Sequence, residues 1–317
     1  MATYKTYESV GNREDLTDVI YNISPTDTPF MSSVGKTKAT AVYHEWQTDS
    51  LADASTANAV VEGADASSAT LAPTTRVGNR TQISQKTIQI AGTLESIDKA
   101  GRKSEKAYQL SKASSELKRD MEKILLSNQA AVTGDASTAR KLGSLQAWLE
   151  TNAVLGATGV AGSDGTTARV SGTDATFTEA MLKSAVKQAY EQGGNPSVLM
   201  VTPTQKQVVS GFAGIAEQRY QAPSNAPTTI VGAADVYLSD FGTLSVVPNR
   251  FMTADADDNG EVAFVLDPEY ASIAYLRPFA TNELAKTGDS EKTQLIVEYT
   301  LEVKNEKAHA IIADLAE

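Results

Sequence analysis

Between Leu94 and Ala131, apolar or small side chains recur every three or four positions, and charged residues occupy many of the positions between them. This spacing predicts one long helix with a narrow apolar stripe. At 1.5 Å per residue the helix would be about 57 Å long. Gly134 would end this helix, and Gly92 would separate it from a preceding strand at Thr81–Ile90.

The stretch before that strand, residues 49–72, consists mainly of Ala, Ser, Thr, Asp and Asn, with few larger apolar side chains and no basic residue. Its composition alone fits a flexible surface loop. Loops of this length are uncommon inside compact domains, however, and strand-like segments lie on both sides, at Ala41–Gln47 and Thr81–Ile90. The alternative is a protruding two-stranded arm. Such an arm beside one long helix is hard to bury in a single molecule, which favours packing on copies of the same chain.

Residues 1–40 have the pattern of an N-terminal arm. Apolar residues from Leu16 to Ile23 have helical spacing, and Ser24-Pro25 would end that short helix because a residue before proline disfavours the helical region. Phe30 and Met31 follow, and we expect them to anchor an extended stretch of chain.

The second half has the pattern of an ordinary α/β region. Thr176 is placed to cap a helix over Phe177–Gln192, and Pro203 opens a shorter helix. Glycines between residues 156 and 172 indicate an irregular link, so we place a boundary near residue 170. The predicted strands are Val198–Thr202, Val236–Leu238, Leu244–Val247, Val262–Leu266, Ser272–Leu276 and Leu295–Val303, followed by an apolar segment at Ala308–Leu315.

The composition excludes several classes of function. The net charge of −11 argues against general nucleic-acid binding, which needs a basic face. The chain has no cysteine, which excludes disulfides and thiolate metal sites. The longest apolar run, Val262–Leu266, is far shorter than the roughly 20 residues of a membrane helix. With no signal-peptide pattern at the N-terminus, we expect a soluble protein of the cytoplasm.

Candidate chemistry is sparse. The two histidines, His44 and His309, lie in separate segments and are expected to be packing or hydrogen-bonding residues. Gly35-Lys36-Thr37 resembles the end of a phosphate-binding loop but lacks the earlier glycine. Asp255–Gly260 matches half of a calcium loop, lacks its final Glu and is interpreted as a hairpin turn. No catalytic residue, cofactor or metal site is expected.

Three stretches resemble a known family: DTPFMSSVGKTKA at 27–39, YHEWQTDSLA at 43–52, and RTQISQKTIQIAGT at 80–93 with the helix after it. Together they are similar to tailed-bacteriophage major capsid proteins of the Hong Kong 97 type. The local match covers about the first 150 residues, and the rest fits by order of elements only.

The resemblance implies an α+β fold with five parts. Residues 1–40 would be the N-terminal arm and 41–92 an extended loop lying over a neighbouring subunit. Residues 93–169 would form the peripheral domain with its spine helix, and 170–283 the axial domain. Residues 284–317 would be strands that return to the peripheral domain.

The function implied is that of a shell protein, not an enzyme. Copies would assemble into hexamers and pentamers of an icosahedral virion shell that encloses double-stranded DNA without specific binding, built in the host bacterial cytoplasm. Separate scaffolding, portal and decoration proteins are further expected partners, and no membrane is involved. Two alternatives stay open: an encapsulin-like compartment with the same fold, and a two-domain hydrolase or ligand-binding protein.

Charge suggests how subunits meet. Residues 49–72 carry a net charge of −4, whereas Glu95–Lys123 has eight basic and six acidic residues, a net of +2. We therefore predict that the acidic loop of one subunit docks on the helix of its neighbour. A solvated mixed-charge helix face is the alternative. The expected subunit-contact residues are Phe30, Trp46, Asp49, Asp53, Glu62, Asp65, Lys99, Arg102, Lys103, Lys106, Lys112, Lys118 and Arg119.

Overall fold

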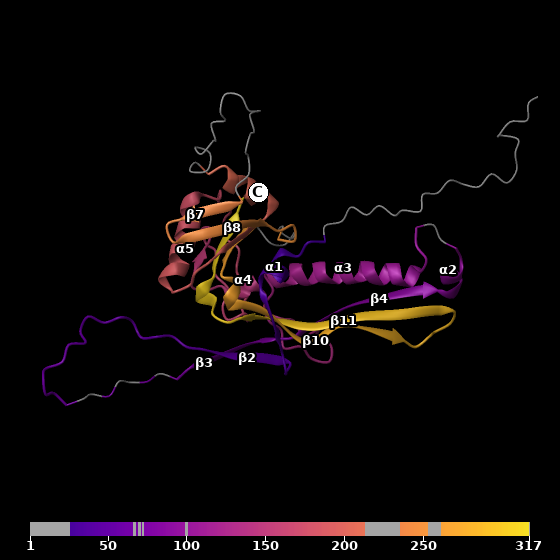
Figure 1. The fold of residues 1–317 in the computed structure, drawn as a ribbon, viewed down its shortest axis with the longest axis horizontal. Coiled ribbons are helices and arrows are strands. Elements are labelled where there is room, and N and C mark those ends of the chain that lie inside the picture. Colours follow the sequence, from indigo (N-terminus) through magenta and orange to yellow (C-terminus); the bar gives the residue numbers. More distant parts are fainter. Residues whose placement is uncertain are drawn as a thin grey trace, which may run out of the picture.

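The computed structural model describes residues 26–65, 68, 71, 73–98, 101–212, 235–252 and 261–316. Two sheets organise the chain (Figure 1): a four-stranded sheet under the long helix α3, and a six-stranded sheet at one end of it. A narrow arm leaves the molecule at the same end. The predicted N-terminal helix near Leu16, Lys99 and the Asp255–Gly260 turn lie outside the described residues.

Helices and strands follow one another along the described parts of the chain. The α-helices are α1 (Pro29–Ser33), α2 (Gly92–Ser96), α3 (Glu105–Leu126), α4 (Leu145–Trp148), α5 (Glu179–Glu191) and α6 (Pro203–Ser210). The strands are β1 (Gly35–Lys38), β2 (Tyr43–Thr48), β3 (Thr75–Arg80), β4 (Gln82–Ala91), β5 (Ala153–Val154), β6 (Val198–Val201), β7 (Val236–Ser239), β8 (Gly242–Pro248), β9 (Glu261–Leu266), β10 (Ala271–Leu284), β11 (Ser290–Val303) and β12 (Ala310–Leu315). Short 3-10 turns at Pro268–Tyr270 and Glu306–Ala308 precede β10 and β12.

The four-stranded sheet has the order β1-β10-β11-β4, and α3 packs along it. The alternating positions of β11, from Leu295 to Val303, are buried as their pattern predicts. On α3 the buried side chains include Leu117, Met121 and Leu125, which share one helical face. Lys86 of β4 adds an ionic link, 3.0 Å from Asp120 and 3.2 Å from Glu116 of α3.

The long helix is shorter than its apolar spacing predicts. The interval Leu94–Ala131 contains parts of two helices: α2 ends at Ser96, where Ile97 is extended, and Gly101 adopts a left-handed backbone (φ +77°) before α3 begins. Ser104 starts α3 by accepting a hydrogen bond from the Ala107 amide. The helix ends at Leu126, not near Gly134, so the prediction of one unbroken helix is wrong at both ends.

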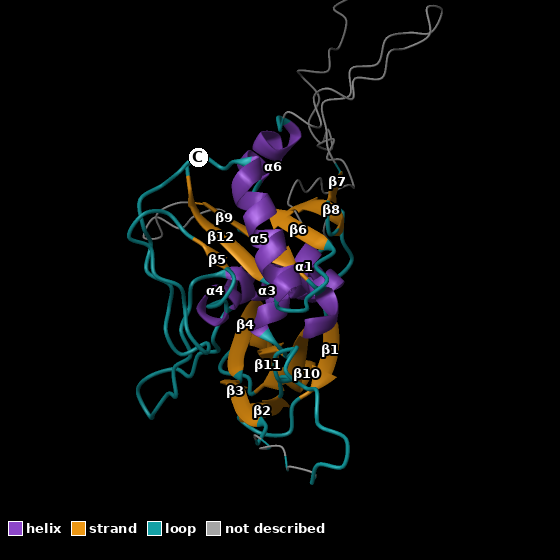
Figure 2. Cartoon of the chain, turned by 90° about the vertical axis from the view of Figure 1, so that its left-hand side faces the viewer, coloured by secondary structure: helices purple, strands orange, loops and turns teal. Residues whose placement is uncertain are grey.

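The six-stranded sheet has the order β5-β12-β9-β6-β8-β7, with α5 and α6 beside it (Figure 2). The predicted strands and helices of this region are confirmed within a few residues. The cap of α5, however, is Thr178, which accepts from the Met181 amide, and not Thr176.

The arm consists of β2 and β3, which pair antiparallel, with Tyr43 opposite Arg80 at the root and Thr48 opposite Thr75 further out. A protruding two-stranded arm is therefore confirmed, but its return strand was placed wrongly. The segment Thr81–Ile90 becomes β4, which pairs with β11 in the body instead.

The sheets do not follow the predicted division at residues 170 and 284. β10, expected in the axial part, lies in the four-stranded sheet beside β11. β12, expected to return to the peripheral part, pairs with β9 and β5 in the six-stranded sheet. We expected residues 284–317 to return to the peripheral domain, but Ala310–Leu315 lies in the six-stranded sheet and not in the sheet of β11.

One hydrophobic core joins the two sheets, and a second lies under α5. The joining core contains Phe30 of α1, Met121 of α3, and residues of both sheets such as Phe264 and Tyr299. Phe30 is fully buried, as an anchor should be, but it lies in the short helix α1 and not in extended chain. Glu122 of α3 holds α1 by accepting hydrogen bonds from the Phe30 and Met31 amides.

Candidate assembly interface

The root of the arm is fixed to the body by one buried amide. Asn79 of β3 donates hydrogen bonds of 2.8 Å to the carbonyls of Gly143 and Leu301, and its Oδ1 accepts from the Gly143 amide. A polar side chain with this many partners holds its backbone in one place, since each lost bond would leave a buried group unsatisfied. The direction in which the arm leaves the body is thereby set.

Aromatic packing supports the same root. Trp46 of β2 lies 5.4 Å from the Trp148 ring of α4 and 5.9 Å from His44. His44 Nε2 is 3.5 Å from Glu302 Oε2 on β11. Trp46 therefore packs on its own chain, as Phe30 does, so neither side chain has the open position that we expected of a subunit contact.

The outer loop of the arm spans residues 49–74. In contrast to the root, its described residues are all exposed. Its large apolar side chains are almost fully exposed: Leu51 98%, Leu71 89%, Val60 85% and Val61 79%. The four predicted acidic contact residues are exposed as well: Asp49, Asp53, Glu62 and Asp65. The described part of the outer loop therefore leaves both its large apolar and its acidic side chains exposed within its own subunit.

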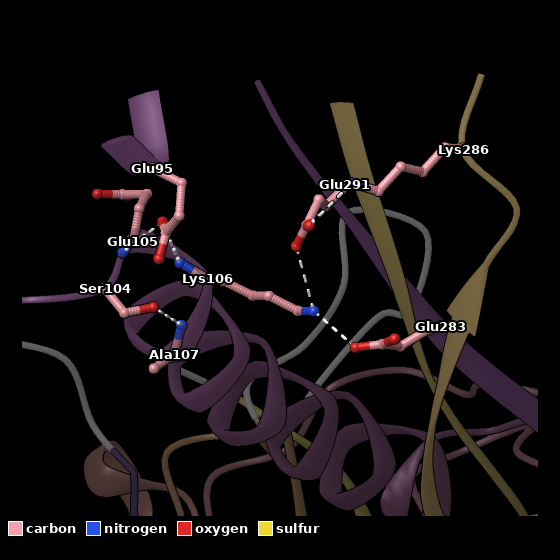
Figure 3. Close-up of polar contacts among 8 residues, drawn as sticks. All are labelled: Glu95, Ser104, Glu105, Lys106, Ala107, Glu283, Lys286 and Glu291. Carbon is pink, nitrogen blue, oxygen red and sulfur yellow. Dashed lines mark hydrogen bonds and ion pairs between the residues drawn. The ribbon is translucent and has the colours of Figure 1, made fainter. Parts of the chain in front are cut away.

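The first turn of α3 uses its basic residues within the chain (Figure 3). Lys106 Nζ lies 2.8 Å from Glu283 and 3.4 Å from Glu291, across the β10–β11 hairpin. The bond to Glu283 is the main reason why the pKa of Lys106 is raised. Glu95 accepts from the Glu105 and Lys106 amides at the helix start. Arg102 pairs with Glu105, and its guanidinium lies 5.3 Å from the Tyr108 ring.

The remaining basic candidates differ in availability. Lys103 and Lys118 are exposed. Lys112 is half-exposed and 3.9 Å from Glu116 on the same helix, a weak surface pair. Arg119 is directed at the body, with its guanidinium 5.5 Å from the Phe251 ring. Of the predicted basic face, Lys103, Lys112 and Lys118 are thus the residues best placed to meet another chain.

The far end of the four-stranded sheet has a small cavity of about 220 Å³. Its lining includes Gly92, Lys106, Lys286 and Glu291. Lys286 lies 3.1 Å from Glu291, and its hydrogen bond is the main cause of the lowered pKa of that carboxyl. Two apolar residues in and next to α2 are exposed, and we call them the tip patch: Leu94 and Ile97.

Chemistry of other kinds has little support in the described part of the chain. No group of three or more His, Asp or Glu side chains among the described residues is placed to hold a metal ion. No helix in the described ranges is long and apolar enough to cross a membrane. His309 is a buried hydrogen-bonding residue, as predicted: its Nδ1 accepts from the Asp267 amide.

Sequence reasoning missed Asn79 and the tip patch. The sequence analysis predicts no strand at Thr75–Arg80, and Asn and Gly are depleted in strands, so no local pattern pointed to Asn79. The tip patch was missed because Leu94 and Ile97 fit the spacing of one long helix, whereas α2 ends at Ser96.

Residues 3–316 match the SU10 major capsid protein family. The chain is 30% identical over 346 residues to the major capsid protein of Escherichia phage Phieco32, across 98% of this chain and 96% of the relative. A chain of the cyanophage A-1(L) capsid has the same fold, with a TM-score of 0.68, 13% identity and 99% of each chain covered. The encapsulin of the holo-SrpI complex from Synechococcus elongatus is similar at a TM-score of 0.56 and 9% identity, over 96% of this chain and 92% of that one. The predicted α+β fold of the Hong Kong 97 type is confirmed.

Proposed function

This chain belongs to the SU10 major capsid protein family, and on that premise we propose how its copies join. It is a structural protein of a phage virion shell and not an enzyme, so the hydrolase alternative is wrong. In our proposal the outer loop of one subunit lies across the α3 face and tip patch of a neighbour.

The observation that carries this proposal is the exposure of four large apolar side chains on the outer loop, Leu51, Val60, Val61 and Leu71. Complete burial of one such side chain stabilises a contact by about 1.5–3 kcal/mol. An exposed ion pair contributes only about 0–1 kcal/mol. Apolar burial therefore supplies most of the attraction.

The receiving surface offers matching chemistry. The tip patch supplies Leu94 and Ile97 for apolar contact. Lys103, Lys112 and Lys118 supply positive charge for the carboxylates of the outer loop. Our proposal keeps the charge attraction predicted from the sequence, with these three lysines as its positive partners. The role of this attraction is to orient the arm.

Repetition of this contact would build the shell. We propose hexamers and pentamers as its units, assembled in the host cytoplasm around double-stranded DNA. The net charge of −11 favours an inner wall that does not adhere to phosphate. Scaffolding, portal and decoration proteins would be separate partners.

The test replaces Leu51, Val60, Val61 and Leu71 by serine in one variant. The matched control replaces three polar residues of the same loop by alanine: Thr56, Asn58 and Ser68. We expect the serine variant to stay folded, by circular dichroism, and to form no particles in electron microscopy, whereas the control assembles. Normal particles from the serine variant would refute the role of the outer loop.

Cargo separates the two shell classes that share this fold. Particles from infected cells would contain DNA in our proposal, and an encapsulin-like compartment would contain protein. Nuclease-resistant nucleic acid recovered from purified particles supports the first, and a stoichiometric enzyme cargo without DNA supports the second.

A further inference from the structure

Glu122 of α3 is a completely buried carboxylate whose partners come from two different parts of the molecule. Its Oε1 accepts hydrogen bonds of 2.7 Å from the Phe30 amide and from Nδ2 of Asn249, and its Oε2 accepts one of 3.0 Å from the Met31 amide. All three donors are uncharged. Burial raises the pKa of Glu122, and the three hydrogen bonds oppose that rise. The ionised carboxylate therefore depends on keeping all three donors in place.

Phe30 and Met31 tie this carboxylate to the four-stranded sheet. Both lie in α1, which leads through Val34 into β1, and β1 pairs parallel with β10, where Gly35 lies opposite Ser272. Figure 1 shows α1 beside the end of α3 that lies nearer the six-stranded sheet. The position of α1 on α3 therefore also sets where the chain enters the four-stranded sheet.

Asn249 ties the same carboxylate to the six-stranded sheet. It follows β8 directly, and its backbone amide donates a hydrogen bond of 2.8 Å to the Val201 carbonyl of β6. Its Oδ1 accepts from the Phe251 amide. The Phe251 ring lies 5.5 Å from the guanidinium of Arg119, which precedes Glu122 by one turn of α3. The turn after β8 is therefore held against α3 at two neighbouring points.

Glu122 acts differently from the core that joins the two sheets. Apolar burial is non-directional, so side chains such as Met121 and Phe264 hold the sheets together but permit small rotations between them. A hydrogen bond has a preferred direction as well as a preferred length. Three hydrogen bonds on one buried carboxylate restrict the angle between the sheets, because loss of any donor would leave part of a buried charge unsatisfied.

We propose that Glu122 is a positioning residue that sets the angle between the four-stranded and six-stranded sheets, and that this angle determines the curvature of the shell. The inference goes beyond the proposed function, since it does not depend on which surface receives the outer loop. Copies that repeat the same contacts close only when the rotation between neighbours is right. A change of angle within the subunit changes that rotation, and with it the size at which particles close.

A matched carboxylate lies wholly within the six-stranded region. Glu261 of β9 is also buried, and its Oε2 accepts from Thr202 Oγ1 at 2.6 Å and from Gln205 Nε2 at 2.8 Å. These donors are uncharged as well, but both belong to α6 and its N-cap, beside the same sheet. Glu261→Gln therefore removes a comparable buried charge and leaves the link between the two sheets intact.

Thiol labelling of free subunits tests the link, because the chain has no cysteine of its own. Met31→Cys reports on α1 and Met252→Cys on the turn after β8, since both side chains are buried. Glu122→Gln keeps the size of the side chain but places a donor where an acceptor is needed. We expect it to raise the labelling rate of both probes at least about tenfold, and Glu261→Gln to change neither rate. A rise at only one probe, or equal rises in both variants, would overturn the proposal.

Asn249→Ala distinguishes one link from two independent contacts. It removes the donor that comes from the six-stranded sheet and leaves both α1 amides in place. A link through Glu122 predicts faster labelling of the Met31→Cys probe as well, because the carboxylate has lost one of its donors. Faster labelling of the Met252→Cys probe alone would contradict the proposal. This variant also gives an answer if Glu122→Gln does not fold.

Particle size is the readout at the level of the shell. Electron microscopy of assembled Glu122→Gln should show a broad range of diameters, whereas Glu261→Gln should give the diameter of the unsubstituted chain. Particles of one normal diameter from Glu122→Gln would contradict the role in curvature. Failure of the unsubstituted chain to assemble would count against the proposed function instead, and the labelling of free subunits would still test Glu122.

Discussion

The root and the outer loop of the arm belong to one continuous segment, but their side chains have opposite environments. At the root, Asn79 and Trp46 find their partners within the same chain. On the outer loop, Leu51 and Val61 remain exposed. The arm is thus positioned by its own subunit, and we propose that another subunit covers its outer loop.

This difference separates stability from assembly. A change at the root removes contacts that the folded subunit already makes, so it lowers the free energy of unfolding. In our proposal, a change on the outer loop removes contacts that form only between copies, so it affects particles and leaves the stability of the subunit unchanged.

Deleting residues 50–71 should abolish stable shells completely. The described residues of this segment are all exposed in their own subunit, so thermal unfolding of the remaining chain should change little. Sedimentation of the purified variant measures the assembly state. Particles of normal size and stability from this deletion would contradict the role of the outer loop in assembly.

Asn79→Ala should destabilise the subunit by about 2–4 kcal/mol, because the buried groups of Gly143 and Leu301 lose their partners. Urea unfolding measures the loss. Thr56→Ala on the outer loop is the control and should stay within about 0.5 kcal/mol of the unsubstituted chain. An Asn79→Ala variant as stable as this control would show that the root is not fixed by the amide.

Acid should lower the free energy of unfolding because of His309. Burial lowers the pKa of this histidine from 6.5 to about 4, so the unfolded chain binds a proton at a pH where the folded chain does not. Its contribution is full above pH 6.5 and is lost as the pH falls toward 4, by about 3 kcal/mol in total. His309→Asn, compared with the unsubstituted chain, should reduce the slope of stability against pH in that window. An unchanged slope would contradict the shift.

Charge reversal on α3 should have the smallest effect. Lys112→Glu should slow assembly at low salt, and the difference should fade at about 1 M salt, where screening acts within about 3 Å. Lys187→Glu is a matched control, since Lys112 and Lys187 each pair with a glutamate one helical turn away. Equal slowing of assembly by both substitutions would contradict an orienting role of α3.

Local patterns predicted much of this fold. The alternation in β11 and the capped helix α5 follow from side-chain period and capping chemistry, which act over a few residues. The long helix was overestimated because its apolar spacing continues through Gly101, where only the backbone conformation shows the break. The spacing of side chains did not indicate that conformation.

The parts that sequence did not predict are long-range. The return strand of the arm was misplaced because Thr75–Arg80 and Gln82–Ala91 are adjacent and both extended, and only their partners distinguish them. Phe30 was expected between subunits, but Glu122, 92 positions away, holds its amide, and the side chain is buried in its own core. Pairing and burial of this kind depend on residues far along the chain.

The most direct test of an arm completed by another copy is the reactivity of a single thiol at Val61→Cys, in a chain that otherwise has no cysteine. Labelling rates are measured on free subunits and on assembled particles under the same conditions. The account predicts rapid labelling of the subunit and labelling at least about tenfold slower in particles, because burial limits access. Equal rates in both states would contradict it.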